Sequence, residues 1–370
     1  MNRGKLFLIA LLGFVVSVGT AFAAPKNTYQ ATILAGNEDD EGFHTVDPLL
    51  QNSWGLAASG SGPWWVANNG SNTSTLYNGA GDKRPLEVIV PGAPTGEVFY
   101  GGSSFLLSNG SPAVFIWAAE DGTLSAWNGT LDPNSAPQHS EIIFNDPGSS
   151  YKGLAVHGDT LFTTDFASCE VEALAFDSTE MKVKEIDTAG GFEDESIPAN
   201  FCPFGIQAIG DSIFVTYALK GGEDDVAGQG HGFVRQFDTD GNLIAAVADH
   251  GQLNSPWGMA QAPSDFGRFS GCLLVGNFGD GTINVFDLDT NTFLAQLSGS
   301  DGNPLVIDGL WALIAGSGAG NGGSSQAIYF SAGPDDETHG LFGVIAIPEP
   351  GTLALLGLAV VALALLRKKR

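Results

Sequence analysis

A short phrase that recurs along this 370-residue chain constrains its fold more than any other feature. Each copy joins an aromatic or glycine turn to a small apolar strand. The copies occupy residues 52–57, 151–156, 203–208, 255–260 and 308–312, with a degenerate copy near 100–103. Their glycines are Gly55, Gly153, Gly205, Gly258 and Gly309, separated by 98, 52, 53 and 51 residues, and 98 is two periods of 49. The spacing therefore predicts six structural units.

Further short strands follow the repeated phrase within each unit. In the fifth unit we expect them at residues 273–277, 282–287 and 293–297. The turns at 238–242 and 287–291 are rich in Asp, Asn and Gly, which tolerate the backbone conformations of tight hairpins. Short strands separated by glycine-rich turns at a constant period are typical of a β-propeller. The sequence thus predicts an all-β fold, a six-bladed β-propeller over residues 28–347.

The two ends of the repeat region predict how the ring closes. The sixth unit has a first strand near 310–315, a second at 327–331 and a third at 340–347, but no fourth strand. A strand-like segment at residues 29–34 precedes the first unit and can supply the missing outer strand. Closure by this N-terminal outer strand would remove two exposed sheet edges. A seven-bladed ring would need a further unit, and we find none in the sequence.

The N-terminus has the pattern of an export signal. Arg3 and Lys5 precede an apolar stretch at residues 6–18, and Ala21-Phe22-Ala23 supplies the small residues of a cleavage site. This order predicts a signal peptide over residues 1–23, removed by signal peptidase. An uncleaved N-terminal anchor is the alternative.

The C-terminus combines a proline break, an apolar run and a basic end. Pro348-Glu349-Pro350 stops any preceding strand, because proline fixes φ and has no N–H to donate. Residues 353–366 are apolar, and as a transmembrane helix they would rise only about 21 Å, against a hydrocarbon core of about 30 Å. The chain ends with four basic residues, Arg367, Lys368, Lys369 and Arg370. A basic cluster of this kind is typical of the cytoplasmic end of a membrane segment. This pattern predicts a segment that the membrane holds transiently.

In order and spacing, residues 348–370 resemble the PEP-CTERM sorting signal of Gram-negative bacteria. The resemblance implies recognition and cleavage by an exosortase, export through the inner membrane, transient anchoring by the C-terminal helix, and delivery to the cell surface or extracellular matrix. The repeat region resembles NHL-like six-bladed propellers. With its tail, the whole chain resembles an uncharacterised bacterial propeller family associated with PEP-CTERM signals.

The net charge restricts the classes of partner. The chain has 15 Lys and Arg against 41 Asp and Glu, and removal of both processed ends leaves a body near −31. Such a surface repels nucleic acid and anionic lipid and attracts cations or basic partners. We therefore expect no nucleic-acid partner; a cationic surface partner or an exopolysaccharide fits better. Simple solubility of an exported protein is the alternative.

Acidic runs fall in the longer predicted loops, which a propeller brings to one face around its channel. These runs are residues 38–41, 193–195, 223–225 and 335–337. Hard divalent cations prefer several carboxylate oxygens, so Ca²⁺ or Mg²⁺ is the candidate cofactor. The expected ligands are Glu223, Asp224, Asp225, Asp335 and Asp336. A solvated acidic rim without a bound ion is the alternative.

Polar residues also recur near the predicted axis. The ends of second strands carry Asn68, Asp165, Tyr217 and Asn277, and the entries to first strands carry Asn52, Asn200, Asn254 and Asp308. Propeller lactonases and gluconolactonases hold a catalytic cation with Glu, Asn and Asp at such positions, although no channel glutamate is evident here. The other interpretation is that these groups cap loops and bind channel water.

Two further residue types have predicted positions. Cys169 and Cys202 are expected on the acidic face between neighbouring blades, where we predict a disulfide, while Cys272 should lie unpaired on the opposite face. Trp54, Trp257 and Trp311 share one repeat position, which blade packing explains. Stacking of a sugar at the channel mouth is the alternative for these tryptophans.

These observations favour an exported binding or scaffold propeller of the cell surface or extracellular matrix over an enzyme. The chain has no Gly-x-Ser-x-Gly, Walker or Cys-x-x-Cys motif, which removes the main support for serine hydrolase, nucleotide and zinc sites. The enzyme alternative is a metal-dependent hydrolase or lactonase with its site at the channel mouth. A purely structural matrix protein is the third hypothesis.

Overall fold

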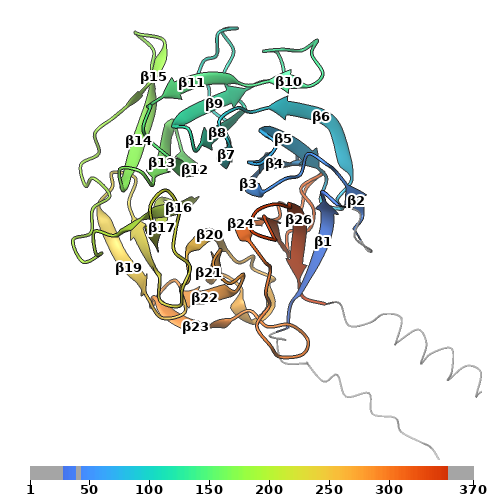
Figure 1. Ribbon diagram of the computed structural model, residues 1–370, viewed down its shortest axis with the longest axis vertical. Coiled ribbons are helices and arrows are strands. Elements are labelled where there is room, and N and C mark those ends of the chain that lie inside the picture. The colour runs from blue at the N-terminus through green and yellow to red at the C-terminus, as the bar shows by residue number, and fades with distance from the viewer. Residues whose placement is uncertain (1–27, 39–42, 349–370) are drawn as a thin grey trace, which may run out of the picture.

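A ring of six β-sheets surrounds a central axis in the computed structural model, which describes residues 28–38 and 43–348 (Figure 1). Within each blade, four strands pair antiparallel from the axis outward. This is the predicted six-bladed β-propeller, and the prediction of the all-β fold class is confirmed.

The blades follow one another along the chain. Blade 1 contains β3 (Ser53–Ala58), β4 (Trp64–Asn68), β5 (Thr73–Tyr77) and β6 (Lys83–Ile89), with the short β10 (Gln138–His139) at its outer edge. Blade 2 contains β7 (Pro94–Phe99), β8 (Phe115–Ala119), β9 (Thr123–Trp127) and β11 (Glu141–Asn145). Blade 3 contains β12 (Tyr151–His157), β13 (Thr160–Asp165), β14 (Glu170–Asp177) and β15 (Lys182–Glu185).

The second half of the ring repeats this order. Blade 4 contains β16 (Phe201–Ile209), β17 (Ser212–Leu219), β18 (Gly232–Phe237) and β19 (Leu243–Asp249). Blade 5 contains β20 (Pro256–Gln261), β21 (Leu273–Asn277), β22 (Ile283–Asp287) and β23 (Thr292–Gln296), with the 3₁₀ helix η1 (Gly267–Phe269) between its first two strands. Blade 6 contains β24 (Leu310–Ala315), β25 (Ile328–Ala332), β26 (Leu341–Ala346), β1 (Gln30–Gly36) and β2 (Thr45–Val46).

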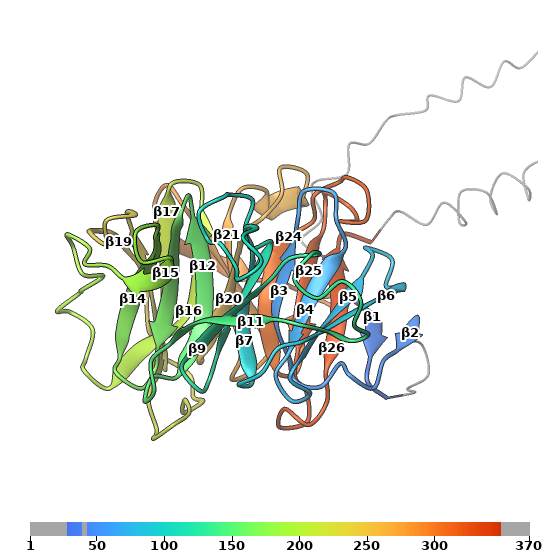
Figure 2. The same cartoon turned by 90° about the horizontal axis from the view of Figure 1, so that it is seen from above.

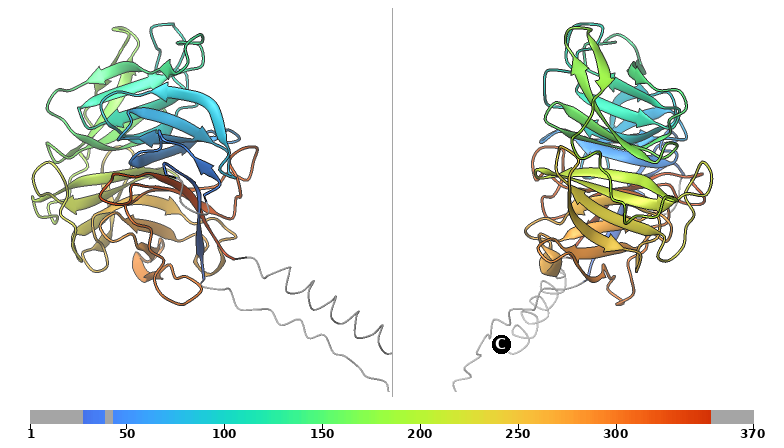
Figure 3. Two further views of the ribbon diagram at one scale, coloured as in Figure 1. Left: turned by 45° about the vertical axis from the view of Figure 1, so that its right-hand side comes forward. Right: turned by 90° about the vertical axis from the view of Figure 1, so that its left-hand side faces the viewer.

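The first strand of the described chain closes the ring. β1 pairs antiparallel with β26, from Gln30 opposite Ala346 to Gly36 opposite Leu341, and the two strands lie side by side in Figures 1 and 3. The Tyr29 hydroxyl donates a hydrogen bond of 2.9 Å to the Phe266 carbonyl of blade 5. Closure by an N-terminal outer strand is therefore confirmed, and β1 covers the outer edge of β26.

The loops between strands define two faces of the disc, which Figure 2 shows edge-on. We call mouth face the side where outer strands lead into inner strands and second strands lead into third strands. The loops 186–200, 220–231 and 333–340 lie there, as expected for the acidic runs. β26 then runs away from the 333–340 loop, so Ile347 leaves the ring on the opposite face.

The predicted signal peptide (1–23) and transmembrane helix (353–366) lie outside the described residues. Within 28–38 and 43–348, no helix is long and apolar enough to cross a membrane.

The inner strands approach one another so closely that their repeat position has no room for a side chain. A Cβ on Gly205 would lie 2.1 Å from the carbonyl oxygen of Trp257, and one on Gly258 would lie 2.1 Å from that of Trp311. Glycine is needed here because the backbones of neighbouring blades converge toward the axis.

Two predicted members of the repeat were wrong. The inner strand of blade 2 is β7, so Gly96 takes the repeat position and the phrase near 100–103 belongs to the loop that follows. In blade 6 Ala312 occupies the repeat position. This assignment follows from Gly258 of blade 5, which packs against the backbone of Trp311 and Leu313, on either side of Ala312. Gly309 lies in the turn before β24, with a φ of 62°.

The close approach predicts a large effect of one methyl group. Gly205→Ala should lower the free energy of unfolding by about 3 kcal/mol, because overpacking against backbone forces two blades apart. Urea unfolding followed by tryptophan fluorescence measures the change. The matched control is Ala312→Gly, which should cost only about 1 kcal/mol. Equal stability of Gly205→Ala and the parent protein would contradict this account of the ring.

A buried carboxyl in blade 3 predicts a pH dependence of stability. Glu172 accepts a 2.8 Å hydrogen bond from the Tyr151 hydroxyl, and burial raises its pKa from the ordinary 4.5 to about 7. Since the folded-state pKa is the higher one, this group lowers stability as the pH rises from about 4.5 to about 7.

Glu172→Gln should remove this pH dependence. We expect the variant to match the parent at pH 4.5 and to exceed it by about 2 kcal/mol at pH 8. Urea unfolding at both pH values provides the measurement, and a parallel stability profile for the two proteins would show the expectation to be wrong.

Candidate functional site

Aromatic side chains from four inner strands close the central channel below its mouth. We call this group the aromatic plug; it consists of Trp54, Phe204, Trp257 and Trp311, all buried. Trp54 and Trp311 stack with ring centroids 3.8 Å apart, and Trp54 meets Trp257, two blades away, at 6.4 Å. The plug therefore spans the axis, and its buried ring faces leave no surface for the stacking of a sugar.

Lys152 occupies the same repeat position as the plug tryptophans, in the inner strand of blade 3. Its side chain is only 3% exposed, and its ammonium lies 5.5 Å from the centroid of the Trp54 ring. The ammonium forms an ion pair with Glu120, and a second, longer pair of 3.4 Å with Asp224. Burial lowers the pKa of Lys152, but the two carboxylates outweigh it and raise this pKa overall. Lys152 is thus a charged group at the base of the channel mouth.

Two amide side chains extend this network to a second glutamate. Asn52 donates a 2.5 Å hydrogen bond to Glu337 and accepts one of 3.1 Å from the Trp311 indole. Asn69 donates a 2.9 Å hydrogen bond to Glu120. Burial is the main reason that the pKa of Glu337 is raised, and the charge of Glu120 adds to it. The channel mouth therefore joins Glu337 and Glu120 in one hydrogen-bonded network through Asn52 and Asn69.

A pocket of about 680 Å³ opens above these groups. It is lined by the charged residues Glu120, Lys152, Lys220, Glu223, Asp224 and Glu337, together with Phe166, Ala167, Gly222 and residues 148–150. Lys220 donates to the carbonyl oxygens of Phe166 and Ala167 at 2.6 and 2.8 Å, and has no carboxylate partner within the described chain. The pocket thus offers ammonium donors and carboxylate acceptors to a ligand.

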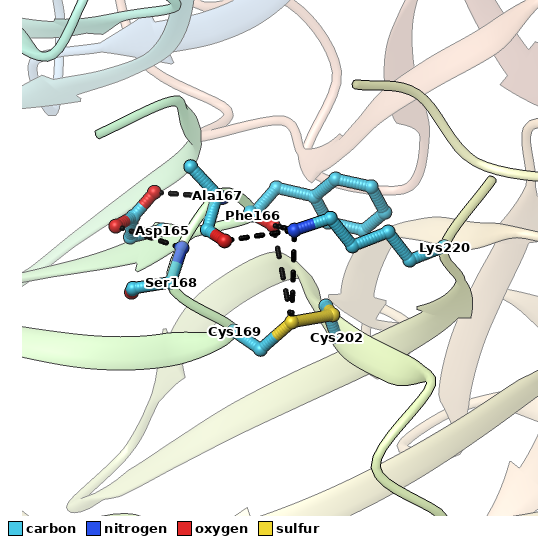
Figure 4. Close-up of a disulfide and its surroundings, with 7 residues drawn as sticks. All are labelled: Asp165, Phe166, Ala167, Ser168, Cys169, Cys202 and Lys220. Atoms are coloured by element: carbon cyan, nitrogen blue, oxygen red, sulfur yellow. Dashed lines mark hydrogen bonds between the residues drawn. A yellow bond between two sulfur atoms is a disulfide. The ribbon is translucent and has the colours of Figure 1, made fainter. Parts of the chain in front are cut away.

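A disulfide supports one wall of this pocket (Figure 4). Cys169 and Cys202 are joined with their Cα atoms 4.5 Å apart, and they are the pair expected from the sequence. The Lys220 ammonium lies 3.8 Å from the Cys169 sulfur, beside the carbonyl groups that it binds. Cys272 is a free thiol in the loop before β21, on the opposite face, as expected.

The polar residues predicted at the second-strand ends stabilise loops. Asn68 donates to the hydroxyls of Thr73 and Thr75, in the next strand of its own blade. Asp165 accepts from the backbone N–H groups of residues 150, 167 and 168, and Asn277 donates to the carbonyl oxygen of residue 252. These three side chains are buried, and none of them lines the pocket. Tyr217, the fourth residue of this set, is also buried and outside the pocket lining, and its hydroxyl has no partner among the described residues.

The residues predicted at the first-strand entries have separate positions. Asn52 reaches the channel network through Glu337, whereas Asn254 accepts a 2.6 Å hydrogen bond from the Gly228 N–H. Asn200 is exposed, and Asp308 accepts from the Asp335 N–H at 3.1 Å. Only Asn52 of this set thus forms a side-chain hydrogen bond with a pocket residue, while the Asn200 carbonyl accepts one of 2.9 Å from the Lys220 N–H.

The candidate cation ligands do not gather into one site. Across 28–38 and 43–348, no group of three or more His, Cys, Asp or Glu side chains is arranged to hold a metal ion. Glu223 and Asp224 line the pocket, and Asp225 is half-buried with its pKa raised by burial. Asp335 and Asp336 are exposed and lie outside the pocket lining.

The sequence missed the two glutamates at the channel mouth. Glu120 directly follows the last residue of β8. When the blades are aligned, Ala119 is equivalent to Asn68 and Asp165, so Glu120 lies one residue beyond them. Because neighbouring strand residues point to opposite sides, this single step turns the side chain toward the axis. A search one residue beyond each second strand would have found Glu120, while Glu337 lies in a loop and carries no comparable pattern.

Comparisons with known proteins place the chain among other propellers and identify its tail. Residues 346–370 match the PEP-CTERM protein-sorting motif. The uncharacterized protein R648 of Acanthamoeba polyphaga mimivirus is 30% identical over 334 residues, covering 86% of this chain and 80% of R648. This chain belongs to the same family. The uncharacterized protein L690 of the same virus is 31% identical, with 85% of each chain covered.

Solved structures resemble the family in fold alone. A protein of unknown function from Bacteroides thetaiotaomicron has a TM-score of 0.52 at 10% identity, covering 86% of this chain and 76% of its own. Virginiamycin B lyase from Staphylococcus aureus has a TM-score of 0.47 at 12% identity, covering 87% and 99%. The sorting motif implies processing by an exosortase, export and sorting to the surface of a Gram-negative cell.

Proposed function

We propose that this protein is a surface binding propeller whose ligand occupies the pocket at the channel mouth. The observation that carries the proposal is the pocket itself, a polar cup with Lys152, Glu120 and Glu337 above a closed aromatic plug. Signal peptidase would remove residues 1–23, and an exosortase would process the tail that begins at Pro348. The released or surface-held ring would then act as a binding or scaffold module of the cell surface or extracellular matrix.

The direction of the tail supports this role. Ile347 leaves the ring on the face opposite the pocket, at the outer part of blade 6. While the apolar helix 353–366 is held in the membrane, the mouth face would point away from the bilayer. The pocket would therefore be open to extracellular ligands before and after processing.

We propose a hydroxyl-rich saccharide segment, such as part of an exopolysaccharide, as the ligand. Sugar hydroxyls can donate to the carboxylates of Glu120 and Glu223 and accept from the Lys220 ammonium. Such charge-assisted hydrogen bonds are stronger than those between neutral groups. Because the plug tryptophans are buried, recognition would rely on these polar contacts.

Titration calorimetry with neutral and uronic-acid-containing hexasaccharides tests this proposal. We expect at least one saccharide to bind, and Lys220→Met to weaken it about tenfold through loss of a hydrogen-bonding cation. Lys184→Met is the matched control, because Lys184 pairs with Asp177 and Glu180 away from the pocket. Absence of binding throughout the panel, or equal loss in both variants, would reject the proposal.

A metal-dependent hydrolase or lactonase is the second candidate function. It is supported by the raised pKa of Glu337 at the channel mouth, since a carboxyl group that stays protonated to a higher pH can act as a general acid in hydrolysis. Turnover of a lactone or phosphoester panel that depends on added Ca²⁺, Mg²⁺, Mn²⁺ or Zn²⁺ and is lost in Glu337→Gln would favour it. A melting temperature that none of the four ions shifts would count against it.

A further inference from the structure

A second pocket, of about 660 Å³, lies between blades 3 and 4. We call it the side pocket. It is lined by residues 168–171, residues 191–195 and 197–199 of the loop before β16, and Phe201, Pro203 and Tyr217. Cys169, one partner of the disulfide, forms part of its edge, and the pocket shares no lining residue with the pocket at the channel mouth.

The side pocket is lined by a tyrosine whose buried hydroxyl has no partner among the described residues. Tyr217 is only 5% exposed, and its hydroxyl has no hydrogen-bond partner among the described residues. A buried polar group without a partner costs stability, so most such groups are bonded. Burial raises the pKa of Tyr217, which keeps the phenol neutral and able to accept or donate one hydrogen bond.

The unpaired carboxylates that line the side pocket favour a cationic ligand. Glu170, Glu193 and Glu195 are exposed at the pocket, and none of them forms an ion pair within 28–38 and 43–348. The remaining carboxylate, Asp194, is neutralised by the buried guanidinium of Arg235. Three uncompensated carboxylates attract a cation and repel an anion.

Apolar side chains line the same pocket as the carboxylates and Tyr217. Val171, Ile197 and Phe201 are half-buried, and Pro203 is buried, all of them in the pocket lining. Methylene groups can bury against such walls while a charged end reaches a polar partner. A long, flexible side chain with a terminal ammonium has this combination of properties.

We propose that the side pocket binds the lysine side chain of an exported peptide or protein. The methylene groups would contact Val171 and Phe201, the Tyr217 hydroxyl would accept a hydrogen bond from the ammonium, and the three glutamates would supply the compensating charge. The ring would then have two separate binding sites, one at the channel mouth and one between blades 3 and 4.

Two matched probes test the charge requirement. N-acetyl-lysine methylamide and N-acetyl-norleucine methylamide differ only in the terminal ammonium group. In titrations followed by two-dimensional NMR, we expect the lysine compound to bind at least tenfold more tightly and to shift signals of blades 3 and 4. Equal affinity of the two compounds, or no binding of the lysine compound, overturns the proposal. Binding of n-pentylamine without binding of the lysine compound also overturns it.

Two variants test the assigned contacts. Tyr217→Phe should weaken binding of the lysine compound about tenfold through loss of a hydrogen bond to a charged group. Its melting temperature should not fall, because the hydroxyl has no internal partner to lose. The double variant Glu193→Gln/Glu195→Gln should weaken binding and reduce its salt dependence.

A tyrosine outside the pocket provides the control. Tyr100→Phe removes a hydroxyl that bonds Asp159, in the loop between β12 and β13 of blade 3, and should leave the affinity unchanged. If Tyr217→Phe binds the lysine compound as tightly as the parent protein, the assignment of the side pocket is wrong. These readouts are independent of Lys220, so they stand or fall separately from the saccharide proposal.

Discussion

Replacing Lys152 with methionine should lower the free energy of unfolding by about 3 kcal/mol and remove ligand binding at the channel mouth. The Lys152 ammonium is almost fully buried. It compensates the charge of Glu120, whose side chain is 29% exposed. Breaking a buried pair leaves the remaining charge without a partner, and this costs about 3 to 5 kcal/mol in well-buried cases. We place the effect at the lower end because Asp224 is exposed to solvent. Urea unfolding measures it.

A double variant separates the lost ion pair from lost packing. In Lys152→Met/Glu120→Gln the charge of Glu120 is removed as well, and only the exposed Asp224 loses a partner, so part of the lost stability should return. Lys184→Met, which removes a partly exposed lysine of blade 3, should change stability far less, because its ion pairs with Asp177 and Glu180 are open to solvent. A Lys152→Met protein as stable as the Lys184→Met control would refute the assignment of Lys152 as a structural cation.

Removing β1 should abolish cooperative folding of the ring. A chain that begins at Asn37 lacks all the residues that pair with β26, together with the buried Tyr29, Leu34 and Ala35. β26 would then become an exposed edge strand with unpaired backbone groups, which promotes association with other chains. We expect a broad, non-cooperative thermal transition by circular dichroism and aggregates in size-exclusion chromatography.

A chain that begins at Thr28 is the matched control for this deletion. It keeps β1 complete, so its melting temperature should equal that of the chain that begins at Ala24. Cooperative unfolding of the chain that begins at Asn37, at an unchanged melting temperature, would show that β1 is not needed for closure.

The repeat predicted the number of blades but not every blade in detail. Four of the five glycines assigned to the repeat lie at the inner-strand position, because that position faces neighbouring backbone at close range. Blade 2 was misplaced since a long loop separates β7 from β8 and makes the spacing uneven, and Gly96 then falls outside a regular period. The glycine pattern did not identify Ala312 as the repeat position of blade 6, because this blade accommodates a Cβ where the other blades have glycine.

The candidate site was much harder to predict than the fold. The sequence located the ends of second strands, yet Asn68 and Asp165 point into the turns of their own blades. The neighbouring position, represented by Glu120 in blade 2, points to the axis instead. Strand periodicity distinguishes these two directions only when the strand end is known to within one residue.

The sequence by itself determined the six-unit ring, the closing strand and the PEP-CTERM tail, because each depends on a local pattern repeated or ordered along the chain. Only the tertiary structure decided which charged groups meet. Lys152, Glu120 and Glu337 come from blades 3, 2 and 6, and the isolated Tyr217 hydroxyl is recognisable only once its surroundings are known. Contacts between such distant residues depend on how each blade is oriented in the ring and on the direction of each side chain. No local sequence pattern encodes either property.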